Sequence, residues 1–426
     1  MDEKLLQYIW KHRLFEVREY FTTKGYPIEI VSVGTENKDS GADFFDARIK
    51  INNTLWAGCV ELHLKSSDWT AHNHFQNDAY KNVILHVVYE HDKDIFTPKG
   101  ELLQTFELKP LIDNSLIEKY RLYMASSHDI VCKNQFAEID AFRLFGYLDR
   151  LLIERLEEKT AKIEEALVRQ VYHKEEVFYH TLAASFGLKI NALPFRLLAE
   201  SLPLTALAKQ KDNLTQIEAM LFGQAGLLPV EQGDNYVELL KKEYNFLQRK
   251  FNLELLCDAS MWKFAKMYPQ GFPTIRIAQF AALIHRSSSL LSKILETKSI
   301  EELINLFTVT ASDYWQSHYR FGVSAKKTSI HTLGRQAVIS LLINTVIPFL
   351  FAYSRWNKDE TLRNRVIDFY ENLDFEQNAI TRKYTALRPD FSNALHSQAL
   401  IQLHNKYCLQ KQCLHCGIGL YLLKMK

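Results

Sequence analysis

The sequence lacks a strong charge of either sign. Its 426 residues carry 52 lysines and arginines against 50 aspartates and glutamates, which gives a formal net charge of +2. This balance excludes a uniformly basic nucleic-acid-binding chain and an acidic, solvating one, so any contact with nucleic acid must come from a local patch. Hydrophobic residues make up 47% and charged residues 24%, which is typical of globular proteins and excludes disordered and fibrous classes.

A secretion signal, internal repeats and low-complexity linkers are also missing. Residues 1–10 contain acids and no apolar run that ends in small residues, so they do not resemble a signal peptide. There are only six cysteines, and three of them are scattered at Cys59, Cys132 and Cys257. Without a secretion signal a disulfide framework is not expected, and the sequence predicts a protein of the reducing cytoplasm.

One apolar run raises the question of a membrane span. Residues 337–353 read AVISLLINTVIPFLFAY, which is short for a span and contains Asn344 and Pro348. We therefore predict a buried helix and no membrane partner.

Residues 1–135 have the pattern of a mixed α/β domain. Apolar residues at helical spacing predict a helix over residues 2–21. A short helix is predicted at residues 75–81. Runs rich in Val, Ile or Phe predict five strands, at residues 28–33, 44–51, 58–64, 83–89 and 103–108. The Asn-Asn pair at residues 52–53 is typical of a hairpin turn between the second and third strands.

From about residue 136 the pattern becomes helical and continues so to about residue 374. Ser299 followed by Glu302 is typical of a capped helix start, and Pro273 suits a first helical turn. We therefore predict an α+β protein. It has an N-terminal mixed sheet with flanking helices in residues 1–135, a larger all-helical domain in residues 136–400 and a short Cys/His tail in residues 401–426.

Two acids on neighbouring predicted strands give the most informative pattern. Asp43 stands at the start of one strand, and Glu61 lies in the next, on the same face as His63 and Lys65. Two such carboxylates can bind Mg²⁺ or Mn²⁺. The ion would polarise a phosphodiester and generate hydroxide, while a neighbouring cation would stabilise the developing charge. The alternative is an amphipathic strand that faces water.

This arrangement resembles the PD-(D/E)XK nuclease superfamily, whose core is a helix, three antiparallel strands, a helix and another strand. The resemblance covers about residues 30–110. It implies that Asp43, within GADF, is the acid at the start of the second core strand, and that Glu61 is the acid of the acidic-X-Lys triplet. His63 stands where the triplet has lysine, and Lys65 on the same face is its substitute.

The loop after Glu61 adds polar residues. Asp68, His72 and His74 can supply a metal ligand, a general base or a phosphate contact, although a hydrogen-bonded turn is the alternative. We take Asp68 and His72 as catalytic candidates. His86 lies within an apolar strand, where a hydrogen-bonded core histidine is the favoured interpretation.

Three residues are candidates for nucleic-acid binding. Gln76 and Tyr80 have the Gln-X3-Tyr spacing of a helical motif found in some branches of the superfamily. Arg276 lies near the start of a predicted helix, where an anion is favoured. A tight helix entry is the alternative for Arg276.

The tail carries a possible second metal site. His404, Cys408, Cys413 and Cys416 have the spacing His-X3-Cys-X4-Cys-X2-Cys. Thiolates and imidazole are the ligands of structural zinc, whose sulfur ligands lie about 3.5–4 Å apart. We predict zinc in preference to an iron–sulfur cluster. Some related nucleases hold such a cluster with three C-terminal cysteines and a remote one, which here would be Cys132 or Cys257.

Nearly the whole chain is similar to a bacterial family, domain of unknown function 2851, that brings no assigned activity. The segments that carry the resemblance are GADF at 41–44, GCVELHLKSSDW at 58–69, NVILHVVYEHD at 82–92, GFPTIRIAQFAALI at 271–284 and the terminal cysteines. The residues themselves favour a metal-dependent nuclease. A catalytically inactive scaffold of the same fold, which binds nucleic acid or protein, is the alternative.

Overall fold

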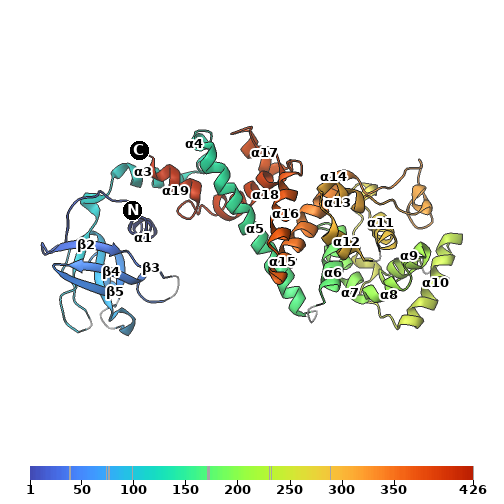
Figure 1. Ribbon diagram of the computed structural model, residues 1–426, viewed down its shortest axis with the longest axis horizontal. Coiled ribbons are helices and arrows are strands. Elements are labelled where there is room, and N and C mark those ends of the chain that lie inside the picture. The colour runs from blue at the N-terminus through green and yellow to red at the C-terminus, as the bar shows by residue number, and fades with distance from the viewer. Residues whose placement is uncertain are drawn as a thin grey trace. The chain divides into compact units, whose positions relative to one another are not determined.

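The protein forms two compact units (Figure 1). The computed structural model describes residues 1–37, 40–72, 74, 77–97, 99–169, 173–229, 231, 233–287 and 289–425. The first unit consists of Met1–Tyr147 together with Gln402–Lys426, and the second of Leu148–Ile401. The tail therefore belongs to the N-terminal unit, whereas the sequence pattern treated it as a separate region.

A mixed sheet of seven strands organises the first unit. Its order is β1-β2-β4-β5-β6-β7, with β3 beside β4. The strands β2, β4 and β5 form an antiparallel meander, and β6 and β7 then add in parallel. This is the succession of strands that the sequence predicts. The bounds are β1 Tyr20–Phe21, β2 Pro27–Ser32, β3 Thr35–Glu36, β4 Phe44–Ile51, β5 Thr54–Lys65, β6 Val83–Glu90 and β7 Thr105–Glu107.

The predicted hairpin joins β4 and β5. Ile51 pairs with Thr54 across a two-residue turn, and Asn52 has a φ of 54°. Tight hairpin turns require this left-handed conformation, which asparagine tolerates better than most residues.

Helix α1 (Glu3–Lys11) is shorter than the predicted helix over residues 2–21. Asp2 caps its start by accepting a hydrogen bond from the N–H of Leu5. At its end Arg13 has a φ of 48°, and the N–H of Leu14 donates to the carbonyl of Ile9. This left-handed cap ends the helix although apolar residues continue beyond it.

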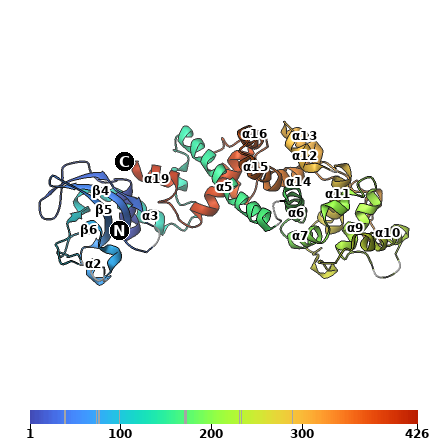
Figure 2. The ribbon, with the colours of Figure 1, turned by 60° about the horizontal axis from the view of Figure 1, so that its bottom comes forward.

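The core of the first unit includes the end of the chain. Helices α3 (Asn114–Ala125) and α19 (Gly417–Lys424) lie side by side (Figures 1 and 2). Leu423 is buried in the same apolar cluster as Leu5 and Phe106. The Lys119 side chain also donates to the backbone carbonyl of Met425.

The second unit is mostly helical, with a small hairpin of β8 (His318–Arg320) and β9 (Val323–Ser324) that the sequence pattern did not predict. Both predicted helix starts are confirmed: Ser299 accepts from the N–H of Glu302, and Pro273 is the first residue of α11. The main helices are α5 Ala141–Arg169, α6 Lys174–Phe186, α7 Ala192–Ser201, α8 Leu204–Ala208, α9 Leu214–Gln224, α10 Asn235–Phe251, α11 Pro273–Arg286, α12 Leu290–Glu296, α13 Ile300–Phe307, α14 Arg335–Leu341, α15 Ile347–Asn357, α16 Glu360–Glu371, α17 Ala379–Thr385 and α18 Ala394–Gln402.

The apolar run becomes a buried helix, as predicted. Arg335–Asn357 is long and apolar enough to cross a membrane by length and composition, but 78% of its most apolar stretch is buried inside the protein. A π-helical segment, Leu342–Val346, interrupts it just before Pro348. Proline has no N–H to donate to the preceding turn, which favours such an irregularity.

Candidate metal centre

Asp43 and Glu61 lie side by side at the junction of β4 and β5, as predicted. The backbone N–H of Asp43 donates to Glu61 Oε2 over 3.0 Å, and the N–H of Leu62 donates to Asp43 Oδ2 over 2.9 Å. From α1, Gln7 Nε2 donates to Asp43 Oδ1 over 2.8 Å. Three of the four carboxylate oxygens therefore accept a hydrogen bond from an N–H group, and Glu61 Oε1 is left for other contacts.

The two acids raise the free energy of each other's charged form. Burial raises the pKa of both carboxyl groups, and the charge of Asp43 raises the pKa of Glu61 further. Glu3, at the start of α1, acts in the same direction on both. Within the described residues neither Asp43 nor Glu61 forms an ion pair with lysine or arginine. A cation bound here would relieve this repulsion.

Two histidines lie next to Glu61 Oε1, and a third contacts one of them. His74 Nε2 lies 3.3 Å and His63 Nε2 3.7 Å from this oxygen. His63 Nε2 also lies 3.2 Å from His72 Nδ1, and one nitrogen from each of the three histidines lies within 4.8 Å of the others. Ligands about 2.0–2.1 Å from a tetrahedral ion lie about 3.3–3.4 Å apart. The spacing of these donor atoms therefore suits a transition-metal ion.

Burial favours the neutral form of His63 and His74, which is the form that metal binding needs. The pKa is lowered to about 3 for His63 and to about 4 for His74. Burial is the main cause, and the charges of neighbouring imidazoles lower both pKa values further. Neutral imidazole offers a lone pair to a metal. His63 and His74 are only 2% and 8% exposed, whereas His72 is exposed. The cluster is therefore open to solvent on the side of His72.

A fourth histidine supports His63 from the next strand. His86 in β6 is fully buried, and its Nε2 lies 2.8 Å from His63 Nδ1. If His63 Nε2 faces a metal, His63 Nδ1 carries the proton and donates a hydrogen bond to His86 Nε2, which is the usual outer contact of a ligating histidine. His86 is buried and hydrogen-bonded, as predicted, but its partner belongs to the cluster.

Two aromatic rings pack against the imidazole of His74. Tyr80 stacks on His74 with ring centroids 3.9 Å apart, and Trp69 meets the same ring edge-on at 5.4 Å. Tyr80 is only 9% exposed. Its position therefore supports a contact that orients His74 and gives no support to the predicted contact with nucleic acid.

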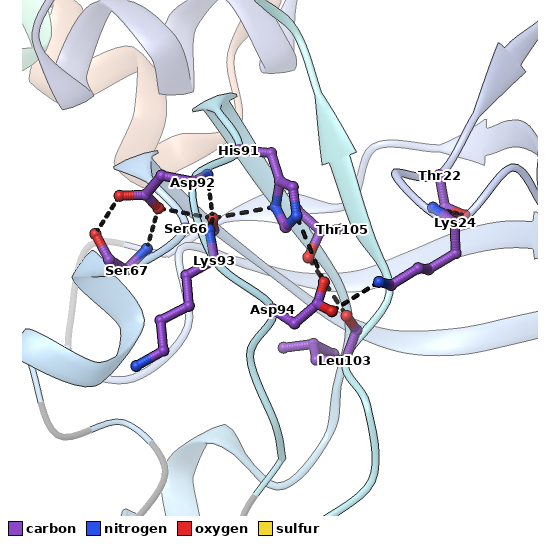
Figure 3. A network of polar contacts seen from close by, with 10 residues as sticks. All are labelled: Thr22, Lys24, Ser66, Ser67, His91, Asp92, Lys93, Asp94, Leu103 and Thr105. Carbon is purple, nitrogen blue, oxygen red and sulfur yellow. Dashed lines mark hydrogen bonds and ion pairs between the residues drawn. The ribbon is translucent and has the colours of Figure 1, made fainter.

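The segment that bears His72 is fixed at its start by a polar network (Figure 3). Ser66 Oγ accepts from the N–H of Asp92 and donates to its Oδ1, each over 3.0 Å. The N–H and Oγ of Ser67 donate to the Asp92 carboxylate over 2.9 and 2.7 Å. Because helix α2 (Asp68–Ala71) follows directly, these bonds tie it to the end of β6.

Residues 3–379 match a family of proteins of unknown function, DUF2851. The chain belongs to this family. No curated protein and no solved structure matches it. The matched region of this DUF2851 protein contains the sheet, the histidine cluster and most of the helical unit, and it ends before the cysteine-bearing tail.

Lys65 and Asp68 of the DUF2851 chain lie at the edge of the cluster. The Lys65 side chain is exposed at the end of β5, and its backbone N–H donates to Asp68 Oδ2 over 2.9 Å. Asp68 thus closes a turn, which was the alternative interpretation. The alternative interpretation, an amphipathic strand that faces water, does not hold at Glu61 and His63, which are only 5% and 2% exposed. The segment that follows β5 brings Trp69, His74 and Tyr80 against that face.

Gln76 and Arg276 are the two other residues predicted to bind nucleic acid. Gln76 is outside the described residues. The DUF2851 protein has Arg276 on α11 of the helical unit, where burial lowers the pKa of its guanidinium group and Nη1 donates to Gln279 Oε1 over 3.4 Å. Arg276 therefore belongs to the helical unit, and its side chain makes this hydrogen bond within that unit.

The predicted zinc geometry is not found in the tail of this DUF2851 protein. His404 and Cys408 lie in the π-helical segment η8 (Leu403–Cys408), with His404 only 3% exposed. Among the described residues, the histidine cluster satisfies a mutual spacing of 4.8 Å and the cysteine sulfurs do not. The expected spacing of about 3.5–4 Å for a single zinc ion is therefore not reached.

Sequence reasoning undervalued His74 and His86 and missed Glu3. The available signal was the His-X-His pair at residues 72 and 74, beside a strand that carries His63. The register of the parallel strands β5 and β6, which sets Glu61 opposite His86, is a long-range feature that no local pattern gives.

Proposed function

We propose that the N-terminal unit is a metal-dependent hydrolase that cleaves phosphodiester bonds in nucleic acid. In this proposal Glu61, His63, His72 and His74 hold a divalent transition-metal ion. The observation that carries it is the grouping of one nitrogen from each of His63, His72 and His74 within 4.8 Å of one another, two of which lie 3.7 and 3.3 Å from Glu61 Oε1. Imidazole ligands suit zinc, cobalt, nickel or iron better than magnesium, which prefers oxygen.

In this proposal the buried ligands make the site rigid and the exposed ligand leaves it accessible. Glu61, His63 and His74 are buried. Asp43 orients Glu61, His86 orients His63 and Tyr80 orients His74, so these three can form a rigid set of ligands on one side of the ion. His72 is exposed, which leaves a side of the ion accessible to water and substrate, as a catalytic site requires. The ion would supply a bound hydroxide at neutral pH.

The choice of a phosphodiester substrate rests on two observations. The order of strands, an antiparallel meander followed by a parallel strand, agrees with the core plan of the nuclease superfamily that the sequence resembles. Lys65 is exposed on the same strand as Glu61, where it can meet a phosphate that approaches the ion.

The test is cleavage of labelled single- and double-stranded DNA and RNA by protein stripped of metal and then supplied with Zn²⁺, Co²⁺, Mn²⁺ or Mg²⁺ separately. We expect cleavage with a transition metal and its loss in Glu61→Gln and His74→Ala. His128→Ala is the matched control, because His128 is an exposed histidine of the same unit outside the cluster. Wild-type protein that is inert with every metal and substrate would contradict the proposal.

A second candidate is a metal-bound scaffold without catalysis. It is favoured by the engagement of Asp43, whose two carboxylate oxygens accept hydrogen bonds from Gln7 and Leu62. Such a protein would bind zinc and nucleic acid, or a protein partner, without cleaving anything. Stoichiometric metal binding by calorimetry, combined with a nucleic-acid mobility shift and no cleavage, would decide for the scaffold.

A further inference from the structure

A polar cleft lies between helix α1 and the tail of the chain, within the first unit. Its walls come mainly from α1, from α3 and from residues 410–415, which precede α19, and its volume is about 570 Å³. We propose that this cleft binds a nucleoside phosphate, whose phosphate group is held by lysine and histidine side chains. The inference goes beyond the proposed hydrolase and does not rest on it, because none of the proposed metal ligands lines the cleft.

Three basic side chains in the cleft are available to an anion. Lys4 and His12 face it from α1 and the residue after α1, and His415 faces it from the tail. Among the residues that the structure describes, no carboxylate forms an ion pair with any of the three. Phosphate oxygens are strong acceptors for lysine and for protonated histidine, so these side chains suit a phosphate group.

The two acids that line the cleft are already engaged. Asp2 Oδ1 accepts from the N–H of Leu5 over 2.8 Å, and its Oδ2 accepts from the Tyr120 hydroxyl over 3.2 Å. Glu36 Oε2 lies 2.6 Å from Lys11 Nζ. The acids therefore cap a helix or neutralise Lys11, and the remaining basic groups give the cleft an excess of positive charge.

The surroundings of His12 reflect this excess. Burial lowers the pKa of His12, and the charges of Lys424 and Lys11 lower it further. His415 acts in the same direction, and Glu36 opposes it. An anion bound in the cleft would offset the repulsion among these positive groups.

A buried hydroxyl without a partner belongs to the same wall. Tyr8 lines the cleft and is 5% exposed, and its hydroxyl has no hydrogen-bond partner within the described part of the chain. Its ring packs against His12, with ring centroids 4.6 Å apart. A buried hydroxyl that lacks a partner costs free energy. A phosphate oxygen would give this donor an acceptor.

The cleft is larger than a bare phosphate needs, and the rest of its lining suits a base. Pockets for small molecules typically span roughly 300–1,000 Å³. Gln7 and Gln412 offer amide donors and acceptors, and Met124 and Leu414 offer apolar surface. A flat heterocycle with donors and acceptors along its edge matches this mixture. Gln7 also donates to Asp43 Oδ1 over 2.8 Å, so it contacts both the cleft and the metal centre.

The wall that the tail contributes is fastened to the rest of the unit. Lys411 Nζ donates to the carbonyl of Met124 over 2.7 Å, which joins the tail to the end of α3. Leu414 and Leu420 pack against the apolar core that contains Leu5. The tail therefore holds His415 at a fixed place opposite α1, as a preformed binding site requires.

The test is calorimetric titration of the full chain with adenosine monophosphate, inorganic phosphate and adenosine, each with EDTA present so that no metal binds the phosphate. We expect adenosine monophosphate to bind with micromolar affinity, and the two fragments to bind about tenfold more weakly or less. Tighter binding of an oligonucleotide with a terminal phosphate would identify a strand end as the source of the nucleotide. Protein that binds neither the nucleotide nor the oligonucleotide would overturn the inference.

Substitutions locate the site. Lys4→Ala and His415→Ala should each weaken the binding of adenosine monophosphate about tenfold, because each removes a hydrogen bond to a charged group. Lys50→Ala is the matched control, since Lys50 is an exposed lysine of the same unit that pairs with Glu29 on the sheet. Glu61→Gln should bind the nucleotide as the wild type does, which separates this inference from the proposed cleavage. Unchanged affinity in both Lys4→Ala and His415→Ala would overturn the ligand set.

The hydroxyl of Tyr8 allows a test with little change in shape. Tyr8→Phe should weaken nucleotide binding several-fold. It should not lower the urea midpoint of the unliganded protein, because the hydroxyl has no hydrogen bond to lose within the described residues. A variant that binds the nucleotide normally but unfolds at lower urea would show that the hydroxyl serves the fold and would overturn its place in the site.

Discussion

The two units bury a glutamate in opposite ways. In the helical unit Glu218 is 1% exposed, and its oxygens accept hydrogen bonds from Ser312 Oγ over 2.7 Å and from Tyr236 Oη over 2.8 Å. In the first unit Glu61 is 5% exposed, and its Oε1 faces two histidine nitrogens. Glu218 accepts from hydroxyl donors, whereas Glu61 Oε1 faces imidazole nitrogens, each of which is a donor or an acceptor according to its tautomer. Buried lone pairs that converge require a shared proton or a metal ion.

The largest expected effect is on metal affinity. Glu61→Gln removes a proposed ligand, so we expect the affinity for Zn²⁺ to fall by more than the roughly 10–100-fold that loss of an outer contact causes. Glu218→Gln should leave it unchanged. Competition with a chromophoric chelator measures both. Equal zinc affinities in Glu61→Gln and Glu218→Gln would contradict the proposal that Glu61, and not Glu218, binds the metal.

The next effect concerns pH and the helical unit. Burial raises the pKa of Glu218 from 4.5 to about 7. Because the folded protein favours the protonated form, wild-type stability should fall as pH rises from about 4.5 to 7, by about 3 kcal/mol. Glu218→Gln should abolish this part of the pH dependence. Urea unfolding of wild type and of Glu218→Gln, each at pH 5 and pH 8, provides the measurement. If the free energy of unfolding differs between the two pH values by the same amount in both proteins, the prediction is refuted.

A smaller effect is expected at the outer contact of the histidine cluster. Leucine in His86→Leu fills a similar space but cannot accept a hydrogen bond from His63 Nδ1. The metal affinity should therefore fall about 10–100-fold. The chelator competition described for Glu61 applies here, with His128→Ala as the control. Unaltered affinity would show that His86 does not orient His63.

The smallest effect tests a helix start in the second unit, which contains none of the proposed metal ligands. Ser299→Ala removes the acceptor for the Glu302 N–H at the start of α13 and should destabilise the protein by about 1 kcal/mol. Ser299→Asp should retain most of the stability. Zinc affinity should be the same in both variants, and a decrease would mean that the two units do not behave separately.

Local patterns predicted the strands better than the site. Alternation and β-branched runs placed β4 at residues 44–51, as the structure has it. The same alternation put Glu61 and His63 on one face but could not show that the following segment covers it. Helix α1 ended early because Arg13 adopts a left-handed conformation that apolar periodicity does not encode.

Long-range contacts account for the other differences between the predicted site and the site in the structure. Parallel pairing of β5 with β6 set His86 beside His63, and nothing in either strand specifies this register. The final helix packs with α3, a contact between distant segments that cysteine spacing within the tail does not encode.

The burial of Leu423 in the core of the first unit has a consequence for synthesis on the ribosome. The N-terminal sheet leaves the ribosome early, but its last core helix emerges only after the whole of Leu148–Ile401 has been translated. At about 5–20 residues per second this is a delay of tens of seconds. During that interval the nascent sheet exposes the apolar surface that α19 later covers, and a chain cut short within the helical unit never completes it.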